Sequence, residues 1–172
     1  MPHLPATLDG LETPGQGRTA LRWRRSFVAL LVAFVLAGTT GLLGVRTTTI
    51  SAAEDGWEIS VEHATIARAG LDVPWTVTLT HDAGFDGDVT LAVTGDYFDI
   101  YESQGFNPEP SDETRDGDTR FLTFSPPAGR TLVVSYDAYI QPSAQLGRSG
   151  TVAVVVDGRR LAPVGFRTVL LP

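Results

Sequence analysis

The sequence predicts an all-β fold, an antiparallel sandwich of about seven or eight short strands, preceded by one transmembrane helix. Three observations carry this prediction. Residues 27–45 are mostly apolar and contain no charged side chain. From Trp57 onward, apolar residues alternate with Thr, Ser and Glu, which is the period of a strand with one buried face. Turn signals rich in Gly, Pro and Asp interrupt this alternation at intervals of about 8–15 residues.

The composition excludes several classes of protein. The chain has 172 residues, enough for one domain and a smaller segment. It contains no Cys, which rules out a disulfide framework, a thiol nucleophile and a Cys-ligated metal. All 13 basic residues are Arg, and the formal net charge is −7. This balance argues against general nucleic-acid binding, because affinity for phosphate comes mainly from clustered cations.

The N-terminal part predicts membrane attachment. Residues 1–26 are rich in Pro, Gly and Thr and lack apolar periodicity, so we expect a disordered, basic cytoplasmic tail. The 19 residues 27–45 would form a helix of about 28 Å, close to the thickness of the hydrocarbon core. Cations stay on the cytoplasmic side, so Arg22, Arg24 and Arg25 before this span predict a single-pass protein of the cytoplasmic membrane, N-terminus inside and C-terminal domain outside. Trp23 stands where an interfacial aromatic residue would anchor the helix.

Two other interpretations of this segment stay open. The run Ser51-Ala52-Ala53 is a small-residue site at which a signal peptidase could cleave, releasing the outer domain after Ala53. The pair Arg24-Arg25 is similar to the core of a twin-arginine export signal. A retained anchor is favoured over both, because the span is longer than the usual signal core of about 7–15 residues and Trp23 replaces the usual hydroxyl residue.

We expect residues 46–56 to be a linker and residues 57–172 to be an extracytoplasmic β-domain, large enough to bury a core without disulfides. The turn Asp157-Gly158 predicts a terminal hairpin. Strand order does not follow from the sequence, so a partly open barrel is the alternative to a sandwich. The predicted strands lie near residues 57–62, 75–80, 89–94, 120–125, 130–140, 151–156 and 163–171.

Part of this domain carries the stretches Ala69-Gly70, Trp75-Thr-Val-Thr-Leu-Thr, Asp88-Val-Thr-Leu-Ala-Val, Phe121-Leu-Thr-Phe and Pro127-Ala-Gly-Arg-Thr-Leu-Val-Val-Ser-Tyr. With them, residues 57–141 resemble the immunoglobulin-like repeat domains of bacterial surface proteins, here as a single copy. The resemblance implies an immunoglobulin-like sandwich on a protein of the cell envelope. The exclusive use of Arg, with abundant Ala, Val and Gly, resembles chains from actinobacteria.

Acidic residues dominate the outer domain. Residues 47–172 carry 18 acidic residues and 8 Arg, a net charge of −10. Calcium prefers several oxygen ligands from flexible loops, so two acidic clusters are weak calcium candidates. Neither cluster matches the helical calcium loop, and turns also require Asp and Gly, so we predict no metal site and no cofactor. The candidates are Asp82, Asp86 and Asp88 around Gly84 and Gly87, and Asp112, Glu113, Asp116 and Asp118 around Gly117.

An aromatic segment precedes the polar loop that we expect over residues 107–118. Tyr97, Tyr101 and Phe106 are candidate partner-contact residues, since aromatic rings supply contact area at low entropic cost. The alternative, which we favour, is that strand alternation buries Phe98 and Ile100 and leaves the Tyr rings lying on the sheet.

Catalytic motifs are not found. His63 and His81 each stand beside an acidic residue, but the chain contains no Gly-x-Ser-x-Gly, no His-Glu-x-x-His and no phosphate-binding loop. We therefore predict a non-enzymatic accessory or scaffold subunit of the cell envelope, anchored in the bilayer through residues 27–45. Its partner would be another membrane or envelope protein and not a nucleic acid. The alternative function is binding of calcium, a glycan or another small ligand through the acidic loops.

Overall fold

The computed structural model describes residues 14–39, 44–102, 105–126 and 128–171. The chain divides into two units, Met1–Leu43 and Gly44–Pro172. The first contains α1 (Pro14–Thr39), so residues 14–26 are helical and the prediction of a disordered tail is wrong for them. Ala, Leu and Arg favour a helix, and extending an existing helix costs little. Residues 1–13 lie outside the described residues.

The predicted span coincides in part with this helix. Its first part, residues 27–39, is helical, residues 40–43 lie outside the described residues, and Gly44 and Val45 are not helical. The described part of the chain contains no helix that is both long and apolar enough to cross a membrane.

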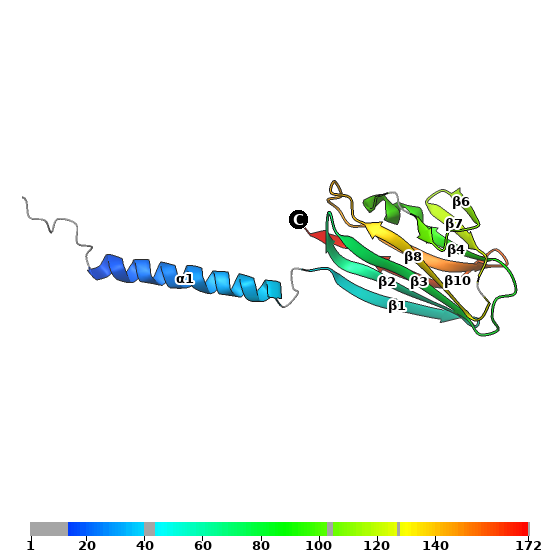
Figure 1. The fold of residues 1–172 in the computed structure, drawn as a ribbon, viewed down its shortest axis with the longest axis horizontal. Helices are drawn as coiled ribbons and strands as arrows, with labels where there is room; N and C mark the ends of the chain where they lie inside the picture. Colours follow the sequence, from blue (N-terminus) through cyan, green and yellow to red (C-terminus); the bar gives the residue numbers. More distant parts are fainter. Residues whose placement is uncertain (1–13, 40–43, 103–104, 127, 172) are drawn as a thin grey trace, which may run out of the picture. The chain divides into compact units, whose positions relative to one another are not determined.

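Two sheets facing each other form the second unit (Figure 1), which confirms a predominantly antiparallel, sandwich-like architecture. A short 3-10 helix, η1 (Gly95–Ile100), directly follows Thr94, the last residue of a strand of the second sheet. The first sheet has the order β1 (Arg46–Glu54), β2 (Trp57–Arg68), β3 (Asp72–His81), β8 (Thr131–Tyr139) and β5 (Phe106–Asn107), with β11 (Val169–Leu171) parallel to β2. The second sheet has the order β10 (Arg159–Arg167), β9 (Ser149–Val156), β4 (Val89–Thr94), β7 (Thr119–Phe124) and β6 (Asp112–Asp116).

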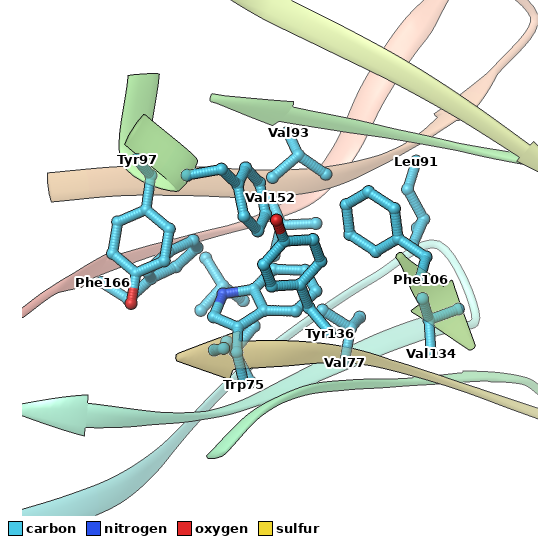
Figure 2. Packing of buried hydrophobic residues seen from close by; sticks show 14 of the residues in the cluster. Trp75, Val77, Leu91, Val93, Tyr97, Phe106, Val134, Tyr136, Val152 and Phe166 are labelled. Carbon is cyan, nitrogen blue, oxygen red and sulfur yellow. The ribbon is translucent and has the colours of Figure 1, made fainter. Parts of the chain in front are cut away.

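Alternating residues of both sheets fill the space between them. On β3, Trp75, Val77 and Leu79 are buried while the Thr residues between them are half-buried on the other face. Figure 2 shows Trp75 and Val77 of one sheet with Leu91 and Val93 of the other in the same cluster. Burial of these side chains is the main stabilising contribution to the fold.

Two Asp-Gly turns set the register of the hairpins. Asp157 and Gly158 have φ values of 50° and 73°, and they join β9 to β10 as the sequence predicts. Asp55 and Gly56, with φ values of 51° and 79°, join β1 to β2 in the same way. This left-handed backbone suits Gly best and is tolerated by Asp, which explains why these dipeptides stand at the two-residue turns.

Three predicted boundaries are wrong. The expected linker, residues 46–56, contains the nine-residue strand β1, and the expected loop, residues 107–118, contains β6. Both strands lie at the edges of their sheets and are largely exposed on both faces, so their sequences show no apolar alternation. The last predicted strand, residues 163–171, is divided, because β10 ends at Arg167 and β11 joins the opposite sheet.

Candidate functional site

Three aromatic rings meet at one end of the sandwich. Trp57 begins β2 and His81 ends β3, and the β2–β3 register places these two residues opposite each other. Their rings are stacked, with centroids 4.0 Å apart and planes 11° from parallel. Phe85, in the loop after β3, has its ring centroid 6.1 Å from that of Trp57. We call Trp57, His81 and Phe85 the pocket rings.

The position of Trp57 along its strand explains why its ring remains accessible. Trp57 shares the inward face of β2 with Ile59 and Val61, which are fully buried, but it is the first residue of the strand and only half-buried. Strand alternation thus directs Trp57 toward the core, while the end of the sandwich leaves part of its ring in solvent.

Local hydrogen bonds hold His81 in its stacked orientation. Its Nδ1 lies 2.6 Å from the carbonyl oxygen of Gly84. A carbonyl only accepts, so Nδ1 carries a hydrogen and donates it to this bond. Gly84 has φ +84°, and its N–H donates back to the His81 carbonyl at 3.0 Å. Another side chain at Gly84 would be strained and would approach the Gly129 carbonyl oxygen within 3.1 Å.

The pocket rings line a hollow of about 280 Å³ that also contains three carboxylates: Asp86, Asp88 and Asp157. We call this hollow the aromatic–acidic pocket. A second hollow, of about 330 Å³, shares Trp57 with it. The second hollow is lined by Glu54, Asp55, Glu58 and Asp82.

The charge of this region is unbalanced. Of the seven carboxylates that line the two hollows, two accept a hydrogen bond from a described residue: Asp88 from the Ser125 hydroxyl and Glu54 from the Ala162 N–H, both at 2.9 Å. Within the described ranges, none of the seven forms an ion pair, and no Arg lines either hollow. Aromatic faces and carboxylates both attract cations. The arrangement therefore suits an ammonium or guanidinium group.

The predicted calcium ligands do not come together as a metal site. Asp82 lines the second hollow, whereas Asp86 and Asp88 line the aromatic–acidic pocket. Of the other cluster, Asp112 and Asp116 lie on the exposed edge strand β6, with Glu113 between them and Asp118 in the turn after it. Among the residues that the structure describes, no three carboxylates or imidazoles are close enough to hold a metal ion.

The candidate partner-contact residues Tyr97, Tyr101 and Phe106 are buried, which contradicts both the contact hypothesis and the favoured alternative that the Tyr rings lie on the sheet. Their exposed fractions are 0%, 2% and 8%. The cause is that residues 95–100 form η1 instead of a strand, so strand alternation does not apply there. Tyr97, Phe98 and Ile100 of η1 are all buried, and the buried Tyr101 follows directly. These rings and their buried aromatic neighbours are called the core cluster: Trp75, Tyr97, Phe98, Tyr101, Phe106, Tyr136 and Phe166.

The buried hydroxyl groups of the core cluster are satisfied within the protein. Tyr101 donates to the Tyr97 oxygen at 2.8 Å, and the Tyr97 hydroxyl lies 2.8 Å from Oγ1 of Thr168. The Thr168 hydroxyl, which is fully buried, donates to the Ala64 carbonyl at 2.6 Å. Burial raises the pKa of both Tyr97 and Tyr101, because the phenolate would lose its hydration. The chain of hydrogen bonds connects η1, the end of β10 and β2.

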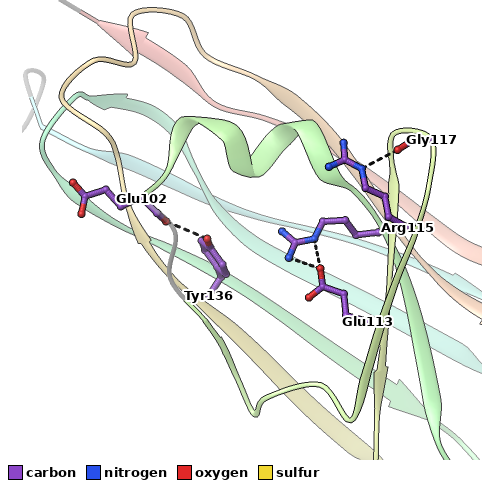
Figure 3. Close-up of polar contacts among 6 residues, drawn as sticks. Glu102, Glu113, Arg115, Gly117 and Tyr136 are labelled. Carbon is purple, nitrogen blue, oxygen red and sulfur yellow. Dashed lines mark hydrogen bonds and ion pairs between the residues drawn. The ribbon is translucent and has the colours of Figure 1, made fainter.

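Arg120 packs against two rings of the core cluster and forms an ion pair with Glu113. The Arg120 guanidinium donates to Oε1 of Glu113 from Nε at 2.9 Å and from Nη2 at 2.6 Å. Its Cζ lies 5.5 and 5.4 Å from the ring centroids of Phe98 and Phe106. Figure 3 shows the Tyr136 hydroxyl donating to the Glu102 carbonyl at 3.2 Å. Glu113 is thus compensated by Arg120, unlike the carboxylates of the aromatic–acidic pocket.

The remaining candidates are not among the residues that line the pocket. His63 is buried beside Phe166, and burial lowers its pKa by disfavouring the charged ring. The basic residues Arg22, Arg24 and Arg25 lie on α1 and are exposed, as is Trp23.

Asp86, Asp88 and His81 could be singled out from the sequence, but their grouping with Trp57 and Phe85 could not. The sequence contains a signal for the stacked pair: Trp57 begins a strand directly after the Asp-Gly turn, and His81 ends the next strand along the chain. Only the β2–β3 register brings these two residues together.

No family model matches the chain, and no curated protein matches it. Function is therefore inferred from the residues and their arrangement.

Proposed function

We propose that this chain is a single-pass membrane protein whose immunoglobulin-like β-sandwich lies outside the cytoplasmic membrane and binds a basic segment of another envelope protein. The chain would act as an accessory or scaffold subunit. The observation that carries the proposal is the aromatic–acidic pocket, in which three rings and three carboxylates line one hollow and no Arg of the described residues compensates them. A guanidinium can stack on an aromatic face and bind a carboxylate at the same time.

The electrostatics of the domain favour the same class of partner. Residues 47–172 carry a net charge of −10, and the second hollow adds four carboxylates next to the pocket. A negative surface attracts basic partners over distances of about one Debye length and disfavours acidic ones. A neutral ligand would gain nothing from these charges.

Features of α1 support the anchor. Large apolar side chains along it are exposed in this chain by itself, among them Leu30 at 68% and Phe34 at 65%. Residues 27–45 contain no charge, and three Arg residues stand within five positions before them. The hydrocarbon core of a bilayer would stabilise an apolar surface of this kind, and the Arg residues would lie on the cytoplasmic side of the membrane.

Peptide binding tests the pocket. The probe is a hexapeptide of alternating Gly and Arg, measured with the full chain in detergent against the same peptide containing neutral citrulline. Asp86→Asn combined with Asp157→Asn keeps the side-chain shapes, and Asn also tolerates the positive φ of residue 157. We expect the pair to weaken binding about tenfold or more, the scale of one charge-assisted hydrogen bond.

Asp112→Asn combined with Asp116→Asn is the matched control. It removes two charges from β6, which lies at the edge of the second sheet opposite to β10 and the turn that contains Asp157. Equal loss of binding in both double variants, or equal affinity for the citrulline peptide, would contradict the proposed site. A rise in melting temperature with calcium or an oligosaccharide, but not with the Arg peptide, would favour the alternative function.

The intact mass of the native protein from detergent-solubilised membranes tests the anchor. We expect a mass that includes residues 27–45 and a co-purifying membrane or envelope protein. A product that begins at Glu54 and is found free of membranes would overturn the anchor.

A further inference from the structure

We propose a second interaction surface, the outer edge of β1, whose occupant is β1 of a second copy of this chain. This inference goes beyond the proposed function, since it uses backbone groups of an edge strand and not the aromatic–acidic pocket.

The outer side of β1 is unpaired. β2 binds β1 along one side, and Ile66 near the end of β2 is paired with both Arg46 and Val169. A residue in a sheet has one neighbour on each side, so β11 lies on the side of β2 away from β1. Within the described residues, β2 is the only strand that pairs with β1, and the outer N–H and C=O groups of β1 have no backbone partner.

The other long edges carry features that prevent pairing. On β6, four of the five side chains are charged. On β10, the register shifts between Leu161 and Val164, Pro163 lies inside this irregular segment, and the strand carries three Arg residues. Charge, Pro and irregular register are the usual protection of an exposed edge. In contrast, β1 has regular register from Thr47 to Glu54 and contains neither charge nor Pro over residues 47–53.

The turn at Asp55-Gly56 determines which backbone groups point outward. A two-residue turn makes Glu54 and Trp57 a hydrogen-bonded pair, and such pairs alternate along an antiparallel ladder. The residues of β1 that bond to β2 are therefore the even-numbered ones. The residues whose N–H and C=O groups point to the free edge are Thr47, Thr49, Ser51 and Ala53.

These outward groups are self-complementary. In an antiparallel pair of β1 strands related by a two-fold axis at Ile50, Thr49 faces Ser51 of the second copy and Thr47 faces Ala53. All four residues are outward-pointing, so each pair exchanges two hydrogen bonds. The same register brings Arg46 opposite Glu54, beside the acidic second hollow. Arg46 is exposed and forms no ion pair among the described residues. The charge pattern therefore favours this antiparallel register over a parallel one.

Cross-linking of the full chain in detergent tests the register. The chain has no Cys, so each introduced Cys is the only thiol. Ile50 is 37% exposed and would face Ile50 of the second copy at a Cα distance of about 4.5 Å, within the range of a disulfide. We expect the Ile50→Cys variant to form a disulfide-linked dimer about tenfold faster or more than the Thr114→Cys variant on β6, because proximity accelerates the reaction. Equal rates would overturn the proposal.

The mass of the full chain in detergent, measured by light scattering, separates this edge from association through α1. We expect a dimer for the unmodified chain and a monomer for Ser51→Pro, since Pro removes one outward N–H and leaves the ladder with β2 intact. Arg115→Pro introduces Pro on the edge strand of the other sheet and should remain dimeric. Circular dichroism confirms that each variant is folded. A monomeric unmodified chain, or a folded Ser51→Pro variant that stays dimeric, would overturn the proposal. Loss of peptide binding in the Asp86→Asn, Asp157→Asn variant with the dimer intact would separate the two sites.

Discussion

The core cluster and the pocket rings are two aromatic groups of the same sandwich with opposite exposure. Tyr97 and Trp75 lie where both sheets cover them, and they are almost completely buried. Trp57 and Phe85 lie at an end of the sandwich, where only part of each ring is covered. The comparison shows that the position of an aromatic residue along the sandwich, rather than its residue type, decides whether it stabilises the fold or is available to a ligand.

The largest expected difference is in stability. We expect Tyr97→Ala to lower the free energy of unfolding by about 3–5 kcal/mol, since it leaves a cavity and removes a hydrogen-bonded hydroxyl. Trp57→Ala should cost about 1–2 kcal/mol, because the ring is only half-buried, yet it should abolish most binding of the Arg peptide. Urea unfolding of both variants measures the difference. Equal losses of stability would break the distinction between the two groups.

The hydrogen bonds of the core cluster should contribute next. Thr168→Val keeps the volume of the side chain but leaves the Ala64 carbonyl without the bond from Oγ1. We expect a loss of about 1–3 kcal/mol, the cost of an unsatisfied buried polar group. Thr90→Val is the matched control, because the Thr90–Thr123 hydroxyl pair is only partly buried. A Thr168→Val variant as stable as the Thr90→Val variant would show that the network is not needed.

Acid should weaken the core through His63. Burial lowers its pKa below 6.5, so the unfolded state binds a proton at a higher pH than the folded state does. The contribution to stability is fully present above pH 6.5 and is lost as the pH falls below it, by at most about 1.4 kcal/mol per pH unit. Urea unfolding between about pH 7.5 and 5.5 measures this slope. The slope should decrease in His63→Gln, and an unchanged slope would assign it to other groups.

The smallest effect is expected where the core cluster meets solvent. Glu113→Gln removes the charge that faces Arg120, but the Glu113 side chain is 42% exposed. We expect a loss of less than about 1 kcal/mol, as for other surface ion pairs, and a smaller loss at high salt. Thermal unfolding at low and high salt measures both. A loss above about 2 kcal/mol would show that this pair belongs energetically to the core cluster.

Only strands with one buried face could be predicted from the sequence. The alternation in β3 and β8 identifies them, because burial on one face selects apolar residues at every second position. The edge strands β1 and β6 lack this selection and take their conformation from the neighbours with which they pair. For the same reason residues 46–56 read as a linker, although they hold the edge on which the proposed dimer depends.

By itself, the sequence determined the antiparallel β architecture, the Asp-Gly turn at residues 157–158, the acidity of residues 47–172 and the basic residues before an apolar run. The tertiary structure decided which aromatic residues are exposed. η1 buried Tyr97 and directly precedes the buried Tyr101, and the β2–β3 register stacked Trp57 on His81. These outcomes depend on contacts between residues far apart in the chain, whereas periodicity and turn chemistry report only on neighbours.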